Sequence, residues 1–91
     1  RSELRGEFVM ERDGVRVGEL TYALAGSRMT ILHTEVAASM RGSGAARKLL
    51  DNAVEFARAE NLKVASRCSY ASAMFARTPA YADVLAGAGG R

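Results

Sequence analysis

The chain has 91 residues, of which 48% are hydrophobic and 25% are charged. This composition is typical of a soluble globular protein, and so short a chain builds one core, which excludes a second domain and wholesale disorder. No apolar run approaches the roughly 20 residues of a membrane span, so we expect no membrane partner. The net charge of +3 favours an anionic ligand. Because the sequence has no basic stripe with interleaved aromatic residues, no nucleic-acid partner is expected.

The chain contains a single cysteine and begins at Arg1 rather than at a methionine. One cysteine cannot form an internal disulfide, which suits a reducing compartment and predicts a cytoplasmic protein. The start at Arg1 favours a piece of a longer sequence. What is present shows no signal-peptide pattern, and the alternative is that such a segment has been removed.

The first third of the chain predicts a meander of three antiparallel strands. Residues 7–11 and 15–24 are β-rich and flank Asp13-Gly14, a strong hairpin signal. The apolar parity of the second run switches at Gly18-Glu19, which predicts a β-bulge there. Residues 28–36 form the third predicted strand, in which the apolar stretch 29–32 predicts burial on both faces.

After Gly44 the apolar period changes from 2 to 3.6, which predicts an amphipathic helix that ends at Asn61. Its apolar stripe comprises Ala46, Leu49, Leu50, Ala53, Val54 and Ala57. Residues 62–66 are β-rich and predict a fourth strand, parallel to the third because a helix connects the two.

The remaining residues, 69–86, are predicted to be helical with a break before Pro79. The tail, residues 87–91, is too poor in side chains to pack and is predicted to be flexible. We therefore expect a single compact α/β (α+β) domain over residues 1–86.

The connection between the third strand and the central helix, residues 41–46, is rich in glycine. Free N–H groups and the positive end of the helix dipole meet there, which suits an anion. Glycines would let a phosphate approach the backbone, and Arg41 would add a charge-assisted contact. The alternative is that the glycines serve only a tight turn. The loop lacks the Gly-Lys-Ser/Thr ending of the Walker motif, and Arg47 stands where the dinucleotide motif needs a third glycine.

The loop resembles the Gln/Arg-x-x-Gly-x-Gly/Ala motif of the GCN5-related N-acetyltransferase (GNAT) superfamily, with Arg41, Gly44 and Ala46 at its fixed positions. Together with "HTEV" before the loop and "LKVASRCSY" and "RTPAYADV" after it, nearly the whole chain resembles the minimal single-domain GNAT-like family. The sequence departs from that family at Ala37 and Ser66, where proline is usual, and at Thr78, where histidine is common. None of these changes removes a phosphate-binding group.

The resemblance implies a protein that binds acetyl-CoA or coenzyme A. The pyrophosphate would be held by backbone N–H groups of residues 42–46 and by Arg41, and the pantetheine arm would follow the end of the third strand. The implied cofactor-binding residues are Val36, Arg41, Gly42, Ser43, Gly44, Ala45 and Ala46.

Three residues are candidates for catalysis. In the family that the chain resembles, the residue matching Cys68 has been proposed to act in acetyl transfer, and a thiol whose pKa of about 8.5 is lowered by Arg67 or a helix N-terminus would accept an acetyl group by thioester exchange. His33 has the chemistry of a general base, and Glu35 shares its strand face. Each has a simpler alternative: Cys68 as a small buried hydrophobe, His33 as a structural residue, and Glu35 as a solvated strand end.

The sequence therefore predicts a small N-acetyltransferase that transfers an acetyl group from acetyl-CoA to an unidentified, amine-type acceptor, directly or through acetyl-Cys68. The alternative is a non-catalytic module that binds coenzyme A or acetyl-CoA. Neither the acceptor nor the oligomeric state can be deduced from the residues.

Overall fold

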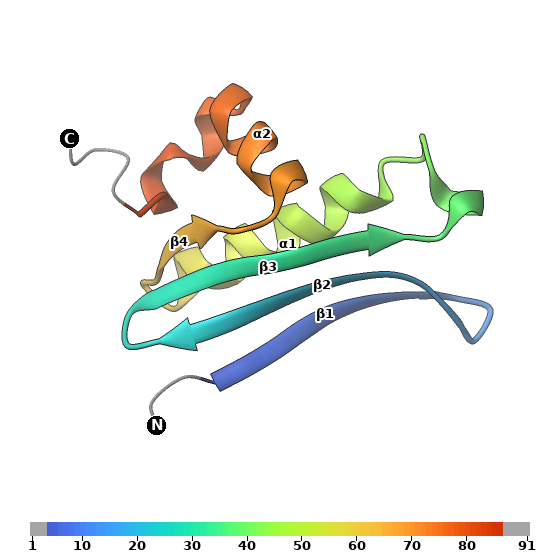
Figure 1. Ribbon diagram of the computed structural model, residues 1–91, viewed down its shortest axis with the longest axis horizontal. Helices are drawn as coiled ribbons and strands as arrows, with labels where there is room; N and C mark the ends of the chain where they lie inside the picture. The colour runs from blue at the N-terminus through green and yellow to red at the C-terminus, as the bar shows by residue number, and fades with distance from the viewer. Residues whose placement is uncertain (1–3, 87–91) are drawn as a thin grey trace.

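The computed structural model describes residues 4–86, which form a four-stranded sheet with helices (Figure 1). The sheet order is β1 (Leu4–Arg12), β2 (Val15–Ala25), β3 (Arg28–Val36) and β4 (Lys63–Ser66). The first three strands are antiparallel, and β4 is parallel to β3. The α/β prediction, with its meander and a parallel fourth strand, is confirmed.

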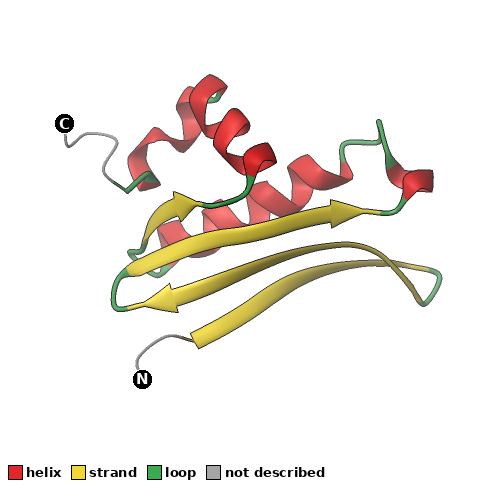
Figure 2. Ribbon diagram, in the orientation of Figure 1, coloured by secondary structure: helices red, strands yellow, loops and turns green. Residues whose placement is uncertain are grey.

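The helical segments are η1 (Ala38–Met40), α1 (Ala45–Ala59), α2 (Ser69–Arg77) and η2 (Pro79–Val84), where η denotes a 3-10 helix (Figure 2). The predicted break before Pro79 is confirmed, although the segment after it is a 3-10 helix. Within residues 4–86 no helix is long and apolar enough to cross a bilayer. The tail 87–91, predicted to be flexible, lies outside the described residues.

The strand irregularities differ from the prediction in position. The Asp13-Gly14 turn has φ values of 53° and 80°, both positive as a tight type I′ hairpin requires. The pairing of β1 with β2 skips Val17, so the bulge precedes the predicted Gly18-Glu19 step. Because Gly18 has no side chain, the apolar pattern does not indicate which face of β2 it occupies. The position of the bulge could therefore not be assigned correctly from the sequence. A second bulge skips Leu32 in β3 and was not predicted.

The core lies between the sheet and α1. The sheet contributes Leu20, Met29 and Ile31, which are fully buried against α1. Burial of each such large side chain stabilises the fold by about 1.5–3 kcal/mol. The buried face of α1 is the predicted stripe with one change, since Ala45 is buried and Ala46 is only half-buried. The prediction of burial on both faces of residues 29–32 is wrong: Thr30 and Leu32 are only half-buried. In Figure 1 no described helix lies over the opposite face of β1–β3, because η2 packs against α1 and the buried Ala71 of α2 belongs to the same core as α1.

Helix α1 ends at Ala59, two residues before the predicted stop at Asn61. Asn61 adopts a left-handed conformation with φ of 58°, and the N–H of Leu62 donates to the carbonyl of Ala57 at 2.8 Å. This pattern satisfies a terminal carbonyl and turns the chain into β4.

Tyr22 packs above Gly6, its partner in the sheet, and contacts both Phe8 and Phe56. The ring centroid of Tyr22 lies 5.4 Å from that of Phe8 and 6.1 Å from that of Phe56. A Cβ at residue 6 would come within 2.6 Å of the ring carbon Cζ of Tyr22. The missing side chain of Gly6 is therefore the space that the tyrosine ring occupies.

We expect Gly6→Ala to lower the free energy of unfolding by about 1–3 kcal/mol, because the new methyl group displaces a packed ring. Denaturant unfolding of the variant measures this loss. The same substitution in a Tyr22→Ala background should cost much less, since the ring is gone. An equal cost in both backgrounds would refute the steric explanation.

Candidate functional site

The loop between η1 and α1 contains two glycines in left-handed conformations. Gly42 has φ of 78° and Gly44 has φ of 85°. A Cβ added at either position would meet no atom within 4 Å. The backbone conformation favours glycine here, and the surface above both residues is open to an approaching group.

The first three backbone N–H groups of α1 lie at this loop. Gly44 is the N-cap and provides no side-chain cap, and the first bond of the helix is the N–H of Lys48 to the carbonyl of Gly44 at 3.0 Å. The N–H groups of Ala45, Ala46 and Arg47 precede that bond and have no intrahelical acceptor. They are available to an anion, together with the positive end of the helix dipole.

Ser43 differs from the other predicted loop residues. Its N–H donates to the carbonyl of Met40 at 3.2 Å, and its hydroxyl donates to the same carbonyl. The residue thus closes the turn that precedes α1. Its side chain lines a separate cavity beside Met10 and Lys48.

A cavity of about 270 Å³ lies over the loop. It contains six of the seven residues predicted to bind the cofactor, all but Ser43, and three that were not in that set: Met40, Arg47 and Tyr70. The full lining is Val36, Met40, Arg41, Gly42, Gly44, Ala45, Ala46, Arg47 and Tyr70. Partial burial raises the pKa of the Tyr70 hydroxyl above its ordinary value of 10.0.

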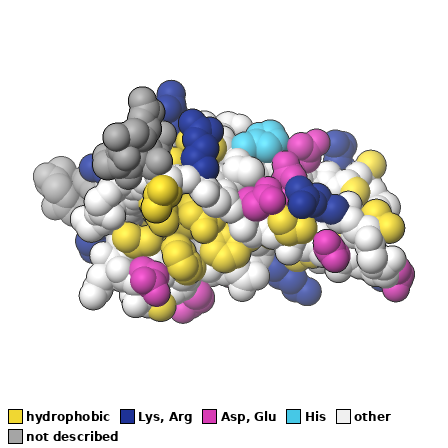
Figure 3. Space-filling model, turned by 90° about the horizontal axis from the view of Figure 1, so that it is seen from below, with side chains coloured by type: hydrophobic (Ala, Val, Ile, Leu, Met, Phe, Trp, Pro, Cys, Tyr) yellow, Lys and Arg dark blue, Asp and Glu magenta, His cyan; other side chains and the backbone are white. Residues whose placement is uncertain are grey.

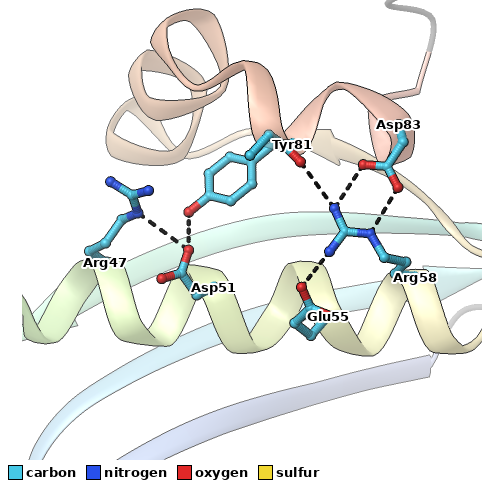
Figure 4. Close-up of polar contacts among 7 residues, drawn as sticks. Arg47, Asp51, Glu55, Arg58, Tyr81 and Asp83 are labelled. Carbon is cyan, nitrogen blue, oxygen red and sulfur yellow. Dashed lines mark hydrogen bonds and ion pairs between the residues drawn. The ribbon is translucent and has the colours of Figure 1, made fainter.

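Arg47 is held in place by residues from two elements (Figure 4). Its Nε donates to Asp51 at 3.3 Å, and its guanidinium lies 5.6 Å from the centroid of the Tyr81 ring. The Tyr81 hydroxyl donates to the same carboxylate of Asp51. The hydrogen bond to Asp51 raises the pKa of Arg47. The sequence showed only a charged residue on the polar side of the helix, because Tyr81 is 34 residues away.

A second contact group fixes η2 on α1 (Figure 4). Arg58 donates to both carboxylate oxygens of Asp83, at 2.8 Å and 2.7 Å, and to the carbonyl of Ala80 at 3.0 Å. The hydrogen bonds from Arg58 lower the pKa of Asp83. Because Tyr81 lies within the same short segment, these bonds also hold its ring above Arg47.

Cys68 lies where β4 separates from β3. Strand pairing ends at Ile31 and Ser66, after which the N–H of Arg67 donates to the carbonyl of Ile31 at 2.8 Å. Beyond that bond β3 continues without β4. The Cys68 side chain is buried on the helix side of this opening, with Sγ 3.7 Å from the Thr34 hydroxyl.

His33 and Glu35 lie on the opposite face of β3. Their strand partners, Thr21 and Glu19, alternate with the buried Leu20 and therefore face away from α1. The His33 Nε2 and Glu35 Oε1 atoms are 3.3 Å apart, and both side chains are more than half exposed. The structure thus brings these two candidates together and separates them from Cys68 by the strand.

Two departures from the resembled family have specific contacts. The N–H of Ala37 donates to the carbonyl of Val17 at 2.8 Å. The hydroxyl of Ser66 accepts from the N–H of Cys68 at 3.1 Å and donates to the carbonyl of Cys68 at 2.9 Å. The hydroxyl of Ser72 donates to Ser66 at 2.9 Å.

Comparison with protein families matches residues 7–84 to the GCN5-related N-acetyl-transferase family. The match covers most of the chain, so the chain belongs to this family. Comparison with curated protein sequences gives no match.

Among solved structures, the chain is similar to a GCN5-like putative N-acetyltransferase from Staphylococcus aureus, with 33% identity and a TM-score of 0.74 over 88% of this chain and 80% of that one. A ribosomal-protein-alanine N-acetyltransferase from Brucella melitensis biovar Abortus 2308 has 21% identity and a TM-score of 0.64 over 92% of this chain and 65% of that one. An acetyltransferase from Bacillus cereus ATCC 14579 has 19% identity and a TM-score of 0.63 over 68% of this chain. The last two show the fold alone, and the chain covers only 46% of the Bacillus cereus protein.

The Tyr81 contacts predict a pH dependence. Burial, with the hydrogen bond to Asp51, raises the pKa of Tyr81 to about 12 from an ordinary value of 10.0. Its contribution to stability is thus complete below pH 10 and is lost as the pH rises towards 12. In an absorbance titration of the tyrosines, Tyr81→Phe should remove ionisation near pH 12 and reduce the alkaline loss of stability. Loss of a phase near pH 10 instead would contradict the assignment.

Proposed function

We propose that this chain binds acetyl-CoA over the loop at the start of α1 and transfers the acetyl group to an amine. The observation that carries the proposal is the single cavity that gathers Arg41, two open glycines and the first amides of α1. Membership of the GCN5-related N-acetyltransferase family supports the same reaction. The diphosphate of coenzyme A fits this cavity chemically, since it needs donors on an unobstructed backbone.

In this proposal each part of the cavity has a role. The amides of Ala45, Ala46 and Arg47 donate to the diphosphate, and the guanidinium of Arg41 adds charge-assisted bonds. Arg47, held by Asp51, offers a second guanidinium on the α2 side of the cavity. Val36 contacts the arm that leads to the thioester. When bound, acetyl-CoA supplies an acyl group activated as a thioester.

In this proposal the reaction takes place at the opening between β3 and β4. The Cys68 thiol loses its proton and attacks the thioester carbonyl, so that a new S–C bond forms while coenzyme A leaves as the thiol with that proton. An amine then attacks acetyl-Cys68 and releases the cysteine thiol. The exposed pair of His33 and Glu35 takes one proton from the ammonium form of the substrate, and the proton that the attacking amine then loses goes to the leaving sulfur of Cys68, which restores the thiol.

One observation favours the alternative of a binding module without turnover. Cys68 is buried, and it lies on the other side of β3 from His33 and Glu35. A cavity that holds coenzyme A without transferring its acyl group would need neither Cys68 nor the exposed pair. Binding and turnover must therefore be measured separately.

Gly44→Ala tests the loop, with Gly14→Ala as its matched control. Both glycines have positive φ, 85° and 80°, and open space where the new Cβ would lie. Each substitution should therefore lower stability by about 1 kcal/mol, but only Gly44→Ala should weaken acetyl-CoA binding, by more than roughly tenfold. Amide NMR titration measures both the affinity and the residues that respond.

In the same titration, the wild-type chain should show shifts concentrated at residues 36–47. Unshifted spectra at millimolar acetyl-CoA would mean that the glycines serve only the turn. Equal affinity of the Gly44→Ala variant and the wild-type chain would also remove the loop from the binding site.

Cys68→Ala separates the two routes of transfer. If the thiol carries the acetyl group, the variant should bind acetyl-CoA as the wild-type chain does but lose amine acetylation, and intact-mass measurement should find an acetyl adduct only on the wild type. Unchanged turnover would assign direct transfer to the amine. Wild-type binding without turnover on any amine would favour the binding module.

A further inference from the structure

Strand β1 ends the sheet, and within the described residues it pairs only with β2 (Figure 1). It runs for nine residues, and the bulge in this hairpin lies in β2. A regular strand edge without proline or bulge presents backbone donors and acceptors to a further strand. The outer edge of β1 therefore has the form of a docking edge.

Apolar side chains gather beside this edge. Leu4 and Val9, exposed to 67% and 37%, are two of the three exposed large hydrophobic residues of the described chain. The aromatic group of Phe8, Tyr22 and Phe56 is only half-buried. Figure 3, seen from the β1 side of the molecule, shows hydrophobic side chains gathered between charged ones.

We propose that the outer edge of β1 binds β1 of a second copy of this chain, antiparallel, with Phe8 opposite Phe8 of the partner subunit. The charge pattern of β1 argues for this occupant. Residues 5, 7, 9 and 11 share the strand face that points away from α1, because side chains alternate and Phe8 contacts Phe56 of α1. In this register Arg5 lies opposite Glu11 of the partner subunit, and two-fold symmetry makes the pair twice.

The neighbouring registers are unfavourable. Centring the pair on Glu7 places this carboxylate opposite its own copy, and centring it on Val9 places Glu7 opposite Glu11 of the partner subunit twice. Like charges directly opposite each other destabilise a strand pair, whereas opposite charges stabilise it. A shift by a single residue would bring opposite faces of the two sheets together. The sequence of β1 therefore selects the register centred on Phe8.

The proposed pair also covers the apolar surface. The two sheets become one continuous sheet, and Phe8 and its copy meet on the side that carries α1. The two aromatic groups of Phe8, Tyr22 and Phe56 then adjoin across the two-fold axis. None of the residues that line the cavity over the glycine loop belongs to β1, so the pair leaves that cavity free.

Charge reversal tests the register. Glu11→Arg and Arg5→Glu each place two like pairs across the interface and should raise the dimer dissociation constant at least roughly tenfold. The double variant, with both substitutions, exchanges the charges and should return the constant to within about threefold of the wild type. Sedimentation over a concentration series measures these constants, and circular dichroism confirms that each variant folds.

Glu60→Arg is the matched control, because it makes the same charge change on an exposed residue just after α1. It should leave the dissociation constant unchanged. A wild-type chain that sediments as a monomer up to about 1 mM would overturn the proposal. So would single variants that dimerise as the wild type does, or a double variant that stays monomeric.

Discussion

The packing of α1 across the sheet is the interaction on which the rest of this structure depends. The apolar stripe of the helix contacts β1, β2 and β3, and its largest residues, Leu49 and Leu50, have almost no exposed surface. This contact fixes where α1 begins, and so it fixes the three free amides and Gly44 beside the end of β3. Helix α1 also provides the surface on which η2 packs, through Arg58 and Tyr81. Because Tyr81 orients Arg47, the position of Arg47 depends on the same packing. A chain that lost this packing would lose the arrangement of this loop with it.

The elements that could be predicted from the sequence are those whose signal is local. The 3.6-residue period, the Asp13-Gly14 turn and the left-handed Asn61 each depend on a few neighbouring residues. The bulge at Val17 was misplaced by one step because Gly18 carries no side chain that marks its face. The prediction that residues 29–32 are buried on both faces was wrong for another reason. An apolar run in a strand is compatible with helices packed on one face of the sheet or on both. Which of these occurs depends on where η2 packs.

In the candidate site, too, the glycine loop has a local sequence signal and the catalytic candidates do not. Backbone groups of consecutive residues, 41–46, necessarily lie together, so the loop could be predicted as a unit. Cys68, His33 and Glu35 come from different strand positions, and their faces follow from pairing and from the unpredicted bulge at Leu32. Arg47 could not be assigned from the sequence because the ring above it belongs to Tyr81. In the sequence nothing distinguishes Thr34 except that it alternates with His33 and Glu35. Its contact with Cys68 appears only in the folded chain.

The two missing prolines raise the question of what stiffens the opening between β3 and β4. At residue 37 the backbone N–H that a proline would lack donates to Val17, which ties the end of β3 to β2. At residue 66 the serine hydroxyl accepts from the N–H of Cys68 and donates to its carbonyl, and so constrains the turn before α2. Hydrogen bonds thus hold the backbone at both positions where the resembled family usually has proline, one between β3 and β2 and one just before α2. Because Cys68 faces one side of β3 and the pair of His33 and Glu35 the other, an acetyl group carried by the thiol would have to meet an amine through the opening between β3 and β4.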